Sequence, residues 1–199
     1  MRIIAGEFRS RTLEAPAGLA TRPTSDRLRE TLFNVLAPRI RGAVFLDLYA
    51  GSGAVGMEAL SRGAASVDFV ERAPAALKAL RANLEKLGLT AGFRVHAISV
   101  GAWLRKFAKG AGAGSKLGAP AAFDLVFLDP PYDAGEEYAA TLGLLGATTG
   151  GLLAAGALVI AEHRRKERLG ERYGGLGRVR LLEQGDAALS FYAASPPAA

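Results

Sequence analysis

The sequence of 199 residues contains no cysteine and only two histidines, His96 and His163. Without cysteine there can be no disulfide framework, no thiolate metal site and no thiol nucleophile. Two histidines are also too few for the histidine clusters that commonly hold metal ions. We therefore expect an activity without a bound metal. We expect His96, His163 and the single tryptophan, Trp103, to be packing or surface residues.

Long hydrophobic runs are missing as well. No stretch of the chain approaches the ~18 apolar residues of a membrane-spanning helix, and the N-terminal residues lack the apolar core of a signal peptide. Half of the residues are nevertheless apolar and 22% are charged, which favours a folded domain over a disordered chain. The simplest expectation is a cytoplasmic protein that does not bind a membrane.

The chain carries an excess of positive charge, with 25 basic residues against 19 acidic ones and a formal net charge of +6. Such an excess is typical of proteins that bind a polyanion such as RNA or DNA. A GC-rich genome offers a second explanation, because it raises the content of arginine, alanine and glycine together. Composition alone leaves both explanations open.

The pattern along the chain separates an N-terminal extension from a main domain. Residues 2–13 predict a short β-hairpin rich in arginine. Thr24-Ser-Asp26 offers N-cap candidates for a helix that we expect Pro38 to stop. We expect an extension over residues 1–41, a main domain over residues 42–194 and a frayed tail over residues 195–199.

Strand and helix patterns alternate in the main domain. The expected strands cover residues 44–48, 66–71, 93–98, 123–128, 157–161, 178–182 and 187–192. The expected helices cover residues 53–62, 74–87, 101–107 and 136–145, and a Gly/Ala-rich surface loop is expected over residues 109–122. This order predicts a Rossmann-like, doubly wound α/β fold with a mostly parallel seven-stranded sheet and an antiparallel C-terminal edge.

A glycine-rich turn follows the first strand of the main domain. Gly51-Ser-Gly53-Ala-Val-Gly56 matches the G-x-G-x-x-G pattern of dinucleotide sites, and Glu71 at the end of the next strand could accept ribose hydroxyls. Asp47, however, lies at the strand end before this turn, where its carboxylate would repel a pyrophosphate. S-adenosylmethionine, with its ammonium and sulfonium groups, suits this carboxylate better. Glu71 fits either cofactor.

A second motif, Asp129-Pro-Pro-Tyr132, follows the apolar strand at residues 123–128. In a doubly wound sheet the ligand crevice lies beyond the carboxyl ends of the strands, so this motif should lie beside the glycine turn. Pro130 and Pro131 have no backbone N–H, which leaves their carbonyl oxygens as acceptors only. A carboxylate and a fixed carbonyl suit the two protons of an exocyclic amine, and the Tyr132 ring can stack on an extruded base.

With these motifs the chain resembles the class I S-adenosylmethionine-dependent methyltransferases. Among them it is most similar to the RsmD family, which methylates a guanine N2 of small-subunit (16S) ribosomal RNA. The resemblance is carried by four blocks of the sequence, Met1–Gly6, Arg22–Asn34, Leu46–Gly53 and Phe127–Tyr132. It implies a cofactor site formed by Asp47, Gly51, Gly53, Glu71 and Ser99. It implies a target-base site formed by Asp129, Pro130, Pro131 and Tyr132.

One departure from the family pattern concerns the adenine of the cofactor. Such enzymes usually place Asp or Asn near the adenine amine, at the position where this chain has Ser99. Either Ser99 or a backbone group would then make that contact.

The resemblance also implies a ribosomal RNA partner, within an assembling small subunit, and a monomeric enzyme. For the RNA contacts we select arginines of the extension, namely Arg2, Arg9, Arg11, Arg22 and Arg27. A second basic run at residues 164–168 is expected to face solvent.

Three other functions stay open from the sequence. A DNA or RNA adenine-N6 methyltransferase would use the same chemistry at Asp129–Tyr132, although 199 residues leave no evident room for a DNA-specificity domain. A nicotinamide-dependent oxidoreductase is disfavoured by Asp47. A non-catalytic RNA-binding module is disfavoured by the intact Asp129–Tyr132 motif.

Overall fold

The computed structural model describes residues 1–16, 25–110, 122–131, 135–147 and 151–194. Some predicted features lie outside this described part of the chain. They are Arg22, Tyr132, the tail at residues 195–199 and most of the predicted loop at residues 109–122.

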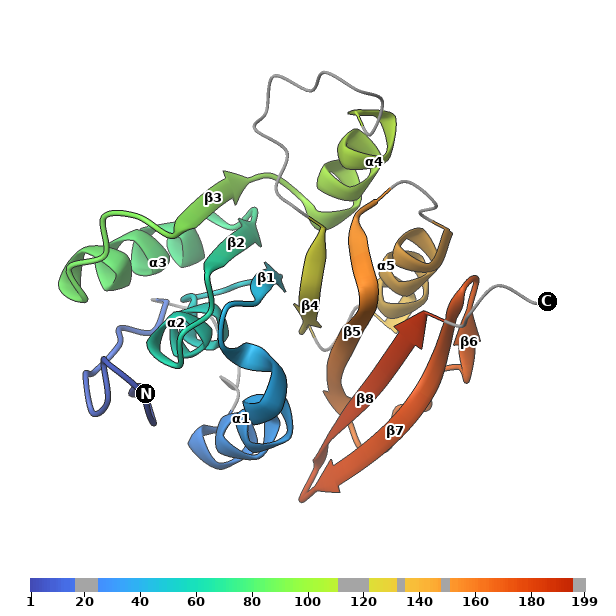
Figure 1. The fold of residues 1–199 in the computed structure, drawn as a ribbon, viewed down its shortest axis with the longest axis horizontal. Helices are drawn as coiled ribbons and strands as arrows, with labels where there is room; N and C mark the ends of the chain where they lie inside the picture. Colours follow the sequence, from blue (N-terminus) through green and yellow to red (C-terminus); the bar gives the residue numbers. More distant parts are fainter. Residues whose placement is uncertain (17–24, 111–121, 132–134, 148–150, 195–199) are drawn as a thin grey trace.

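An eight-stranded sheet forms the centre of the fold, in the order β3-β2-β1-β4-β5-β8-β7-β6 (Figure 1). The strands are β1 (Val44–Leu48), β2 (Ser66–Glu71), β3 (Phe93–Ala97), β4 (Phe123–Leu128), β5 (Leu153–Arg164), β6 (Arg172–Tyr173), β7 (Leu176–Gln184) and β8 (Ala187–Ala194). β1 to β5 pair in parallel, whereas β8, β7 and β6 continue the sheet with antiparallel pairing. The predicted α/β fold with an antiparallel C-terminal edge is confirmed.

The sheet has one more strand than the seven that the sequence predicts. The additional strand, β6, is only two residues long and pairs with the first two residues of β7. Two residues are too few to show the alternation by which a strand is recognised in a sequence.

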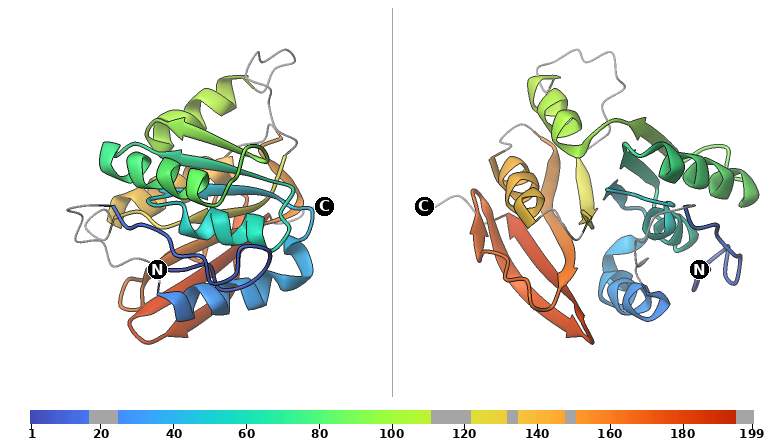
Figure 2. Two further views of the ribbon diagram at one scale, coloured as in Figure 1. Left: turned by 90° about the vertical axis from the view of Figure 1, so that its left-hand side faces the viewer. Right: turned by 180° about the vertical axis from the view of Figure 1, so that it is seen from behind.

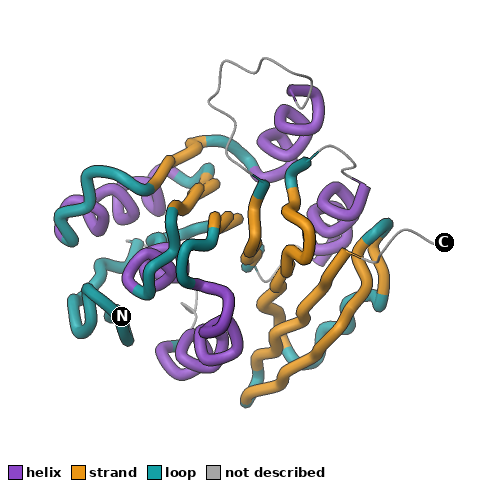
Figure 3. Tube along the Cα trace, viewed as in Figure 1, coloured by secondary structure: helices purple, strands orange, loops and turns teal. Residues whose placement is uncertain are grey.

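Helices cover both faces of the sheet in the described part of the chain (Figures 2 and 3). On one face lie α1 (Asp26–Ile40), α2 (Ala54–Ser61) and α3 (Pro74–Lys86), and on the other lie α4 (Val100–Gly110) and α5 (Gly135–Ala147). Each set of helices has its own apolar core against the sheet. Phe33, Phe45 and Phe69 belong to the core under the first set, and Trp103, Leu128 and Tyr138 to the core under the second.

The helix α1 begins as expected but continues past its proline. Ser25 is the N-cap, and its Oγ accepts a hydrogen bond of 3.2 Å from the backbone N–H of Leu28. The expectation that Pro38 stops the helix was wrong, because α1 continues to Ile40 with Pro38 inside it. The proline lies in the last turn, so its missing N–H removes a single bond, to the carbonyl four residues earlier.

The predicted hairpin at residues 2–13 forms only in a short version. One antiparallel bridge, between Arg2 and Thr12, and the backbone hydrogen bonds beside it connect the two arms. Other backbone N–H groups of this segment bind α2. Ile4 and Ala5 donate to the carboxylate of Glu58 at 2.7 and 3.0 Å. Two more bonds run from the Glu7 and Phe8 N–H groups to Ser61. Donors used in this way are not available for a strand ladder.

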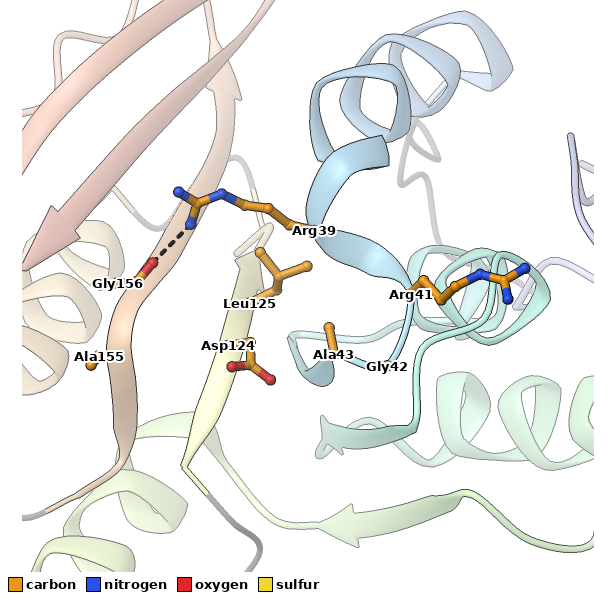
Figure 4. A pocket seen from close by; sticks show the side chains of 8 residues that line it. All are labelled: Arg39, Arg41, Gly42, Ala43, Asp124, Leu125, Ala155 and Gly156. Carbon is orange, nitrogen blue, oxygen red and sulfur yellow. Dashed lines mark hydrogen bonds between the residues drawn. The ribbon is translucent and has the colours of Figure 1, made fainter.

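A shallow pocket of about 300 Å³ lies at the amino ends of the strands (Figure 4). Arg39 at the end of α1 crosses it and donates a hydrogen bond of 2.8 Å to the carbonyl of Gly156 in β5. Asp124 accepts the N–H of Val44 at 2.8 Å and so fixes the start of β1. These contacts serve the fold at the edge opposite to the carboxyl ends of the strands.

Buried charges hold the N-terminal segment on the main domain. Arg29 and Glu58 are both fully buried, with 3.8 Å between Nε and Oε2, and Arg62 donates to Glu58 at 2.7 Å. Arg29 also donates to the carbonyl of Arg2 and to Asp26. Removal of one member would take away the buried counter-charge of the other and leave it with one partner nearer to the surface, Asp26 for Arg29 or Arg62 for Glu58, which is unfavourable.

We therefore predict that Glu58→Gln lowers the free energy of unfolding by ~3 kcal/mol, because it removes the buried charge that Arg29, Arg62 and the N–H groups of Ile4 and Ala5 share. Urea unfolding followed by circular dichroism measures the change. Glu85→Gln, at an exposed position of α3, is the matched control and should change stability by less than ~0.5 kcal/mol. Equal effects of the two substitutions would contradict the role given to this buried pair.

Candidate functional site

Four carboxylates end four neighbouring strands on the same face of the sheet. Asp47, Glu71 and Glu162 are part of β1, β2 and β5, and Asp129 directly follows β4. The pairing sets Asp47 opposite Phe127 and Leu128 opposite Ala161. Because side chains alternate along a strand, all four carboxylates fall on the side of the sheet covered by α1, α2 and α3. The row lies at the carboxyl ends of the parallel strands, where doubly wound folds bind their ligands.

Asp47 is almost completely buried, with 1% of its surface exposed. Its Oδ2 accepts a hydrogen bond of 2.9 Å from the backbone N–H of Gly56 in α2. Burial raises the pKa of Asp47 to about 8, against the opposing effect of this hydrogen bond, and the charge of Glu71 adds to the increase. A cation placed beside Asp47 would reverse this shift and leave the carboxylate ionised.

Glu71 holds the glycine turn against β2. One carboxylate oxygen accepts the N–H of Gly51 at 2.9 Å, and the other accepts the N–H groups of Arg72 and Ala73, both at 2.7 Å. The sequence motif suggested that Glu71 contacts ribose hydroxyls. In the structure Glu71 also stabilises the glycine turn through these hydrogen bonds. The two roles are compatible because the oxygen that accepts only the N–H of Gly51 has a further lone pair.

The glycines of the turn are required by its backbone. Gly51 and Gly53 have φ angles of +56° and +80°, which side chains disfavour. Gly56 faces another restriction, because a Cβ there would lie 2.3 Å from the ring of Phe69 in β2. The turn therefore brings the N-terminus of α2 close to the carboxyl ends of β1 and β2, as an N-terminal anion or cofactor site requires.

Tyr49 has a positive φ of +60° although it is not a glycine, a conformation that is rare and strained for an aromatic residue. Its hydroxyl lies 2.5 Å from Glu137 and 2.7 Å from Thr141, both in α5. The contacts tie the glycine-turn loop to the helix that follows the Asp129 motif. The sequence did not reveal this tether, because its partners are about 90 residues apart in the chain.

Asp129 lies at the carboxyl end of β4, next to the row formed by Asp47 and Glu162. It is half-buried, Pro130 is buried and Pro131 is exposed. Burial raises the pKa of Asp129 well above its usual range, and the charges of Glu162 and Asp47 raise it further. This motif therefore presents a carboxyl group followed by two residues that have no backbone N–H and can offer only their carbonyl oxygens.

Ser99 lies just beyond β3, at the far end of the same edge. The N–H of Ile98, its neighbour, donates to the carbonyl of Glu71 at 3.0 Å, and the carbonyl of Ser99 accepts the N–H of Trp103 at the start of α4. The predicted cofactor residues thus follow one another along β3, β2 and β1, and the predicted base site continues this line at β4.

Glu162 was not among the residues selected from the sequence. It is 2% exposed and lies in β5 beside Asp129. Its position in the sequence could have identified it, because Glu162, like Asp129, directly follows a predicted apolar strand. No group of three or more His, Cys, Asp or Glu side chains in the described ranges is arranged to hold a metal ion.

The predicted RNA-binding arginines spread over different parts of the surface. Arg2 is exposed and lies 3.6 Å from Asp26, and Arg9, Arg11 and Arg27 are exposed as well. Arg9 and Arg11 lie near the C-terminal end of α2, whereas Arg27 shares a groove with Glu162. Of the members of this set that the structure describes, Arg27 alone lies in a groove with one of the row's carboxylates.

The other residues interpreted as packing have that role in the structure. His163 is buried, with its ring nitrogens 2.9 Å from the carbonyl of Arg164 and from Ser190 Oγ, and burial lowers its pKa. The ring centroids of Trp103 and His96 lie 5.5 Å apart.

No described helix is long and apolar enough to cross a membrane.

Comparison with known proteins places this arrangement in a family. The model of a family described as conserved hypothetical protein 95 matches residues 1–193. YlbH of Bacillus subtilis, provisionally named an rRNA methyltransferase, is 35% identical over 96% of this chain and 98% of its own length. Ribosomal RNA small subunit methyltransferase D of Escherichia coli K12 is 40% identical over 81% of this chain and 74% of its own.

Solved structures with a similar fold have descriptions like those of these relatives. The yhhF protein of Escherichia coli, provisionally named a methyltransferase, superposes with a TM-score of 0.78 and 34% identity over 98% of this chain and 97% of its own. A protein described as a methyltransferase complexed with SAH has a TM-score of 0.65 at 14% identity, over 83% of this chain and 49% of the other, which shows the shared fold alone. The chain belongs to the RsmD/YlbH family, whose model it matches over nearly its whole length.

Proposed function

We propose that this protein transfers a methyl group from S-adenosylmethionine to the exocyclic N2 amine of a guanine in small-subunit ribosomal RNA, as a monomer acting on an assembling subunit. The observation that carries the proposal is the row of buried and half-buried carboxylates beside the glycine turn and Pro130-Pro131. A relative named ribosomal RNA small subunit methyltransferase, 40% identical to this chain, supports the choice of substrate.

The residues present fit S-adenosylmethionine. Asp47 is buried with a raised pKa and faces Glu71 and Asp129, so the site is short of positive charge. A ligand that carries an ammonium and a sulfonium group would supply that charge. Gly51 and Gly53 keep the backbone free of side chains where the ligand must approach. Glu71 and Ser99 would hold the ribose and the adenine along β2 and β3.

The chemistry at the acceptor follows from Asp129 and Pro130. When bound, S-adenosylmethionine supplies an electrophilic methyl group. The Asp129 carboxylate and the Pro130 carbonyl accept the two N–H bonds of the amine and so draw its lone pair out of the ring π-system. The lone pair forms the new N–C bond as the S–C bond breaks. The proton then leaves the acidic aminium and can pass to the Asp129 carboxylate.

Positioning accounts for much of the expected rate. Two reactants held in line react as if one were present at an effective concentration of ~10⁵–10⁸ M. The tether from Tyr49 to Glu137 connects the donor half of the site to the helix after the acceptor motif, which keeps the two halves in register.

The direct test is transfer of a tritiated methyl group to deproteinised ribosomal RNA, to small-subunit particles and to DNA, followed by nucleoside analysis. We expect N2-methylguanosine from RNA or particles and no label in DNA. Recovery of N6-methyladenine instead would establish the adenine-specific alternative.

For the acceptor residue, we predict that Asp129→Ala lowers kcat by a factor on the order of 10³, because the amine loses its charged acceptor. The dissociation constant for S-adenosylmethionine, measured by calorimetry, should change by less than ~3-fold since Asp129 lies on the acceptor side. Methyl transfer at the wild-type rate in this variant would show that Asp129 does not hold the amine.

For the donor residue, we predict opposite effects of Asp47→Asn on stability and on binding. The folded-state pKa of about 8 exceeds the unfolded value of 3.8, so the ionised carboxylate destabilises the ligand-free protein increasingly as the pH rises through this window. The substitution should therefore raise the melting temperature at pH 8 and have little effect at pH 4. It should weaken S-adenosylmethionine binding by ~100-fold or more, because the ligand loses a buried ion pair with Asp47. A lower melting temperature at pH 8 would refute the assignment.

A further inference from the structure

A groove of about 950 Å³ runs between α1 and the antiparallel part of the sheet. Its walls come from the N-terminal turn of α1, the end of β5, the loop after β5 and the turn between β7 and β8. In Figure 1 this is the region where α1 faces the lower ends of β7 and β8. The groove is more than three times the volume of the pocket at the opposite edge.

Cationic side chains form the rim of this groove. They are Arg27 from α1 together with Arg164, Arg165, Lys166 and Arg168 from the end of β5 and the loop after it, and all five are exposed. Glu183 and Asp186 also line the rim, and Glu183 lies 3.2 Å from Arg165. The run at residues 164–168 therefore does face solvent as predicted, but it does so along a concave surface with Arg27.

The inner wall of the groove carries an acidic side chain. Glu162 is 2% exposed and lines the groove, and its strand pairs with β4 so that Ala161 lies opposite Leu128. The next residues along the two strands are Glu162 and Asp129. The groove thus opens at a cationic rim and reaches a carboxylate adjacent to the acceptor motif.

We infer that this groove holds the RNA strand at its target nucleotide, with phosphates on the cationic rim and the guanine N1–H hydrogen-bonded to Glu162 beside Asp129. The inference rests on the proposed function, because it assigns Glu162 to the same guanine whose amine Asp129 receives. Glu162 would be a specificity-determining residue that touches the substrate but not the methyl group.

The chemistry of the two purines explains why a second carboxylate matters. Guanine presents adjacent donors, the N1–H and the N2 amine, whereas adenine presents an acceptor, N1, beside its N6 amine. An ionised carboxylate can only accept hydrogen bonds, so Glu162 in this form would favour guanine and repel the lone pair at N1 of adenine. A site built to bind an N–H group rejects an analogue that lacks it by factors of up to ~10⁴–10⁵.

The test uses RNA that carries either guanine or 2-aminopurine at the methylated position, once that position has been mapped. 2-Aminopurine keeps the amine at C2 but has an acceptor at N1. The wild-type enzyme should prefer guanine in kcat/KM by ~10²-fold or more. In Glu162→Gln the amide NH2 can donate to N1 of 2-aminopurine, and the neutral carbonyl is a weaker acceptor for the N1–H of guanine than a carboxylate. The preference should therefore shrink at least ~10-fold.

Glu183→Gln is the matched control, since it makes the same substitution on the rim, away from Asp129. Its base preference should remain that of the wild type. Unchanged melting temperature and S-adenosylmethionine affinity show that Glu162→Gln is folded. An unchanged base preference in Glu162→Gln would overturn the inference alone, whereas a wild-type enzyme that methylates no guanine would overturn the proposed function as well.

The rim is tested separately by Lys166→Ala combined with Arg168→Ala. We expect KM for the RNA to rise ~10-fold and the slope of log affinity against log salt concentration, over 50–200 mM KCl, to fall by ~1–2. The control pair Lys78→Ala with Arg81→Ala removes one lysine and one arginine from the exposed face of α3 and should change neither value. Equal effects of the two pairs would overturn the assignment of the groove to RNA.

Discussion

The burial of carboxylates at one edge of the sheet is the constraint on which the rest of this structure depends. Asp47 and Glu162 are almost completely buried, and an ionised carboxylate is unfavourable in such a place unless donors or a cation surround it. The glycine turn supplies part of what is needed, with the N–H of Gly56 on Asp47 and the N–H of Gly51 on Glu71. The glycine turn and the start of α2 therefore hold their positions partly through hydrogen bonds to Asp47 and Glu71. A cationic ligand would complete this arrangement.

The N-terminal segment is attached to the same unit. Glu58 and Ser61 of α2 bind backbone groups of residues 4–8, and Asn83 of α3 donates both to the carbonyl of Glu14 and to that of Ser52 inside the glycine turn. The extension that leads into α1 thus shares its support with the cofactor turn. Because α1 also forms one wall of the groove, the surface proposed for RNA and the site proposed for the methyl donor are held by one set of contacts.

Much of this arrangement could be predicted from the sequence, because the parallel strands are continuous apolar runs and Asp47, Glu71 and Asp129 belong to recognisable motifs. The features that could not be predicted depend on contacts between distant segments. The hairpin at residues 2–13 is shorter than predicted because α2 takes several of its backbone donors. Glu162 has no motif around it, and its importance follows only from the register that sets it beside Asp129. The continuation of α1 past Pro38 shows that a proline in the last turn removes too little to end a helix.

The central claim, that the carboxylate row is built for a cation, is tested most directly by the protons exchanged when S-adenosylmethionine binds. Isothermal titration calorimetry at pH 7 in buffers of different ionisation enthalpy measures this number. Asp47, with a pKa of about 8, is largely protonated in the ligand-free protein and should ionise beside the ligand. We predict release of close to one proton or more for each ligand bound. Binding without proton release, or with proton uptake, would contradict the account.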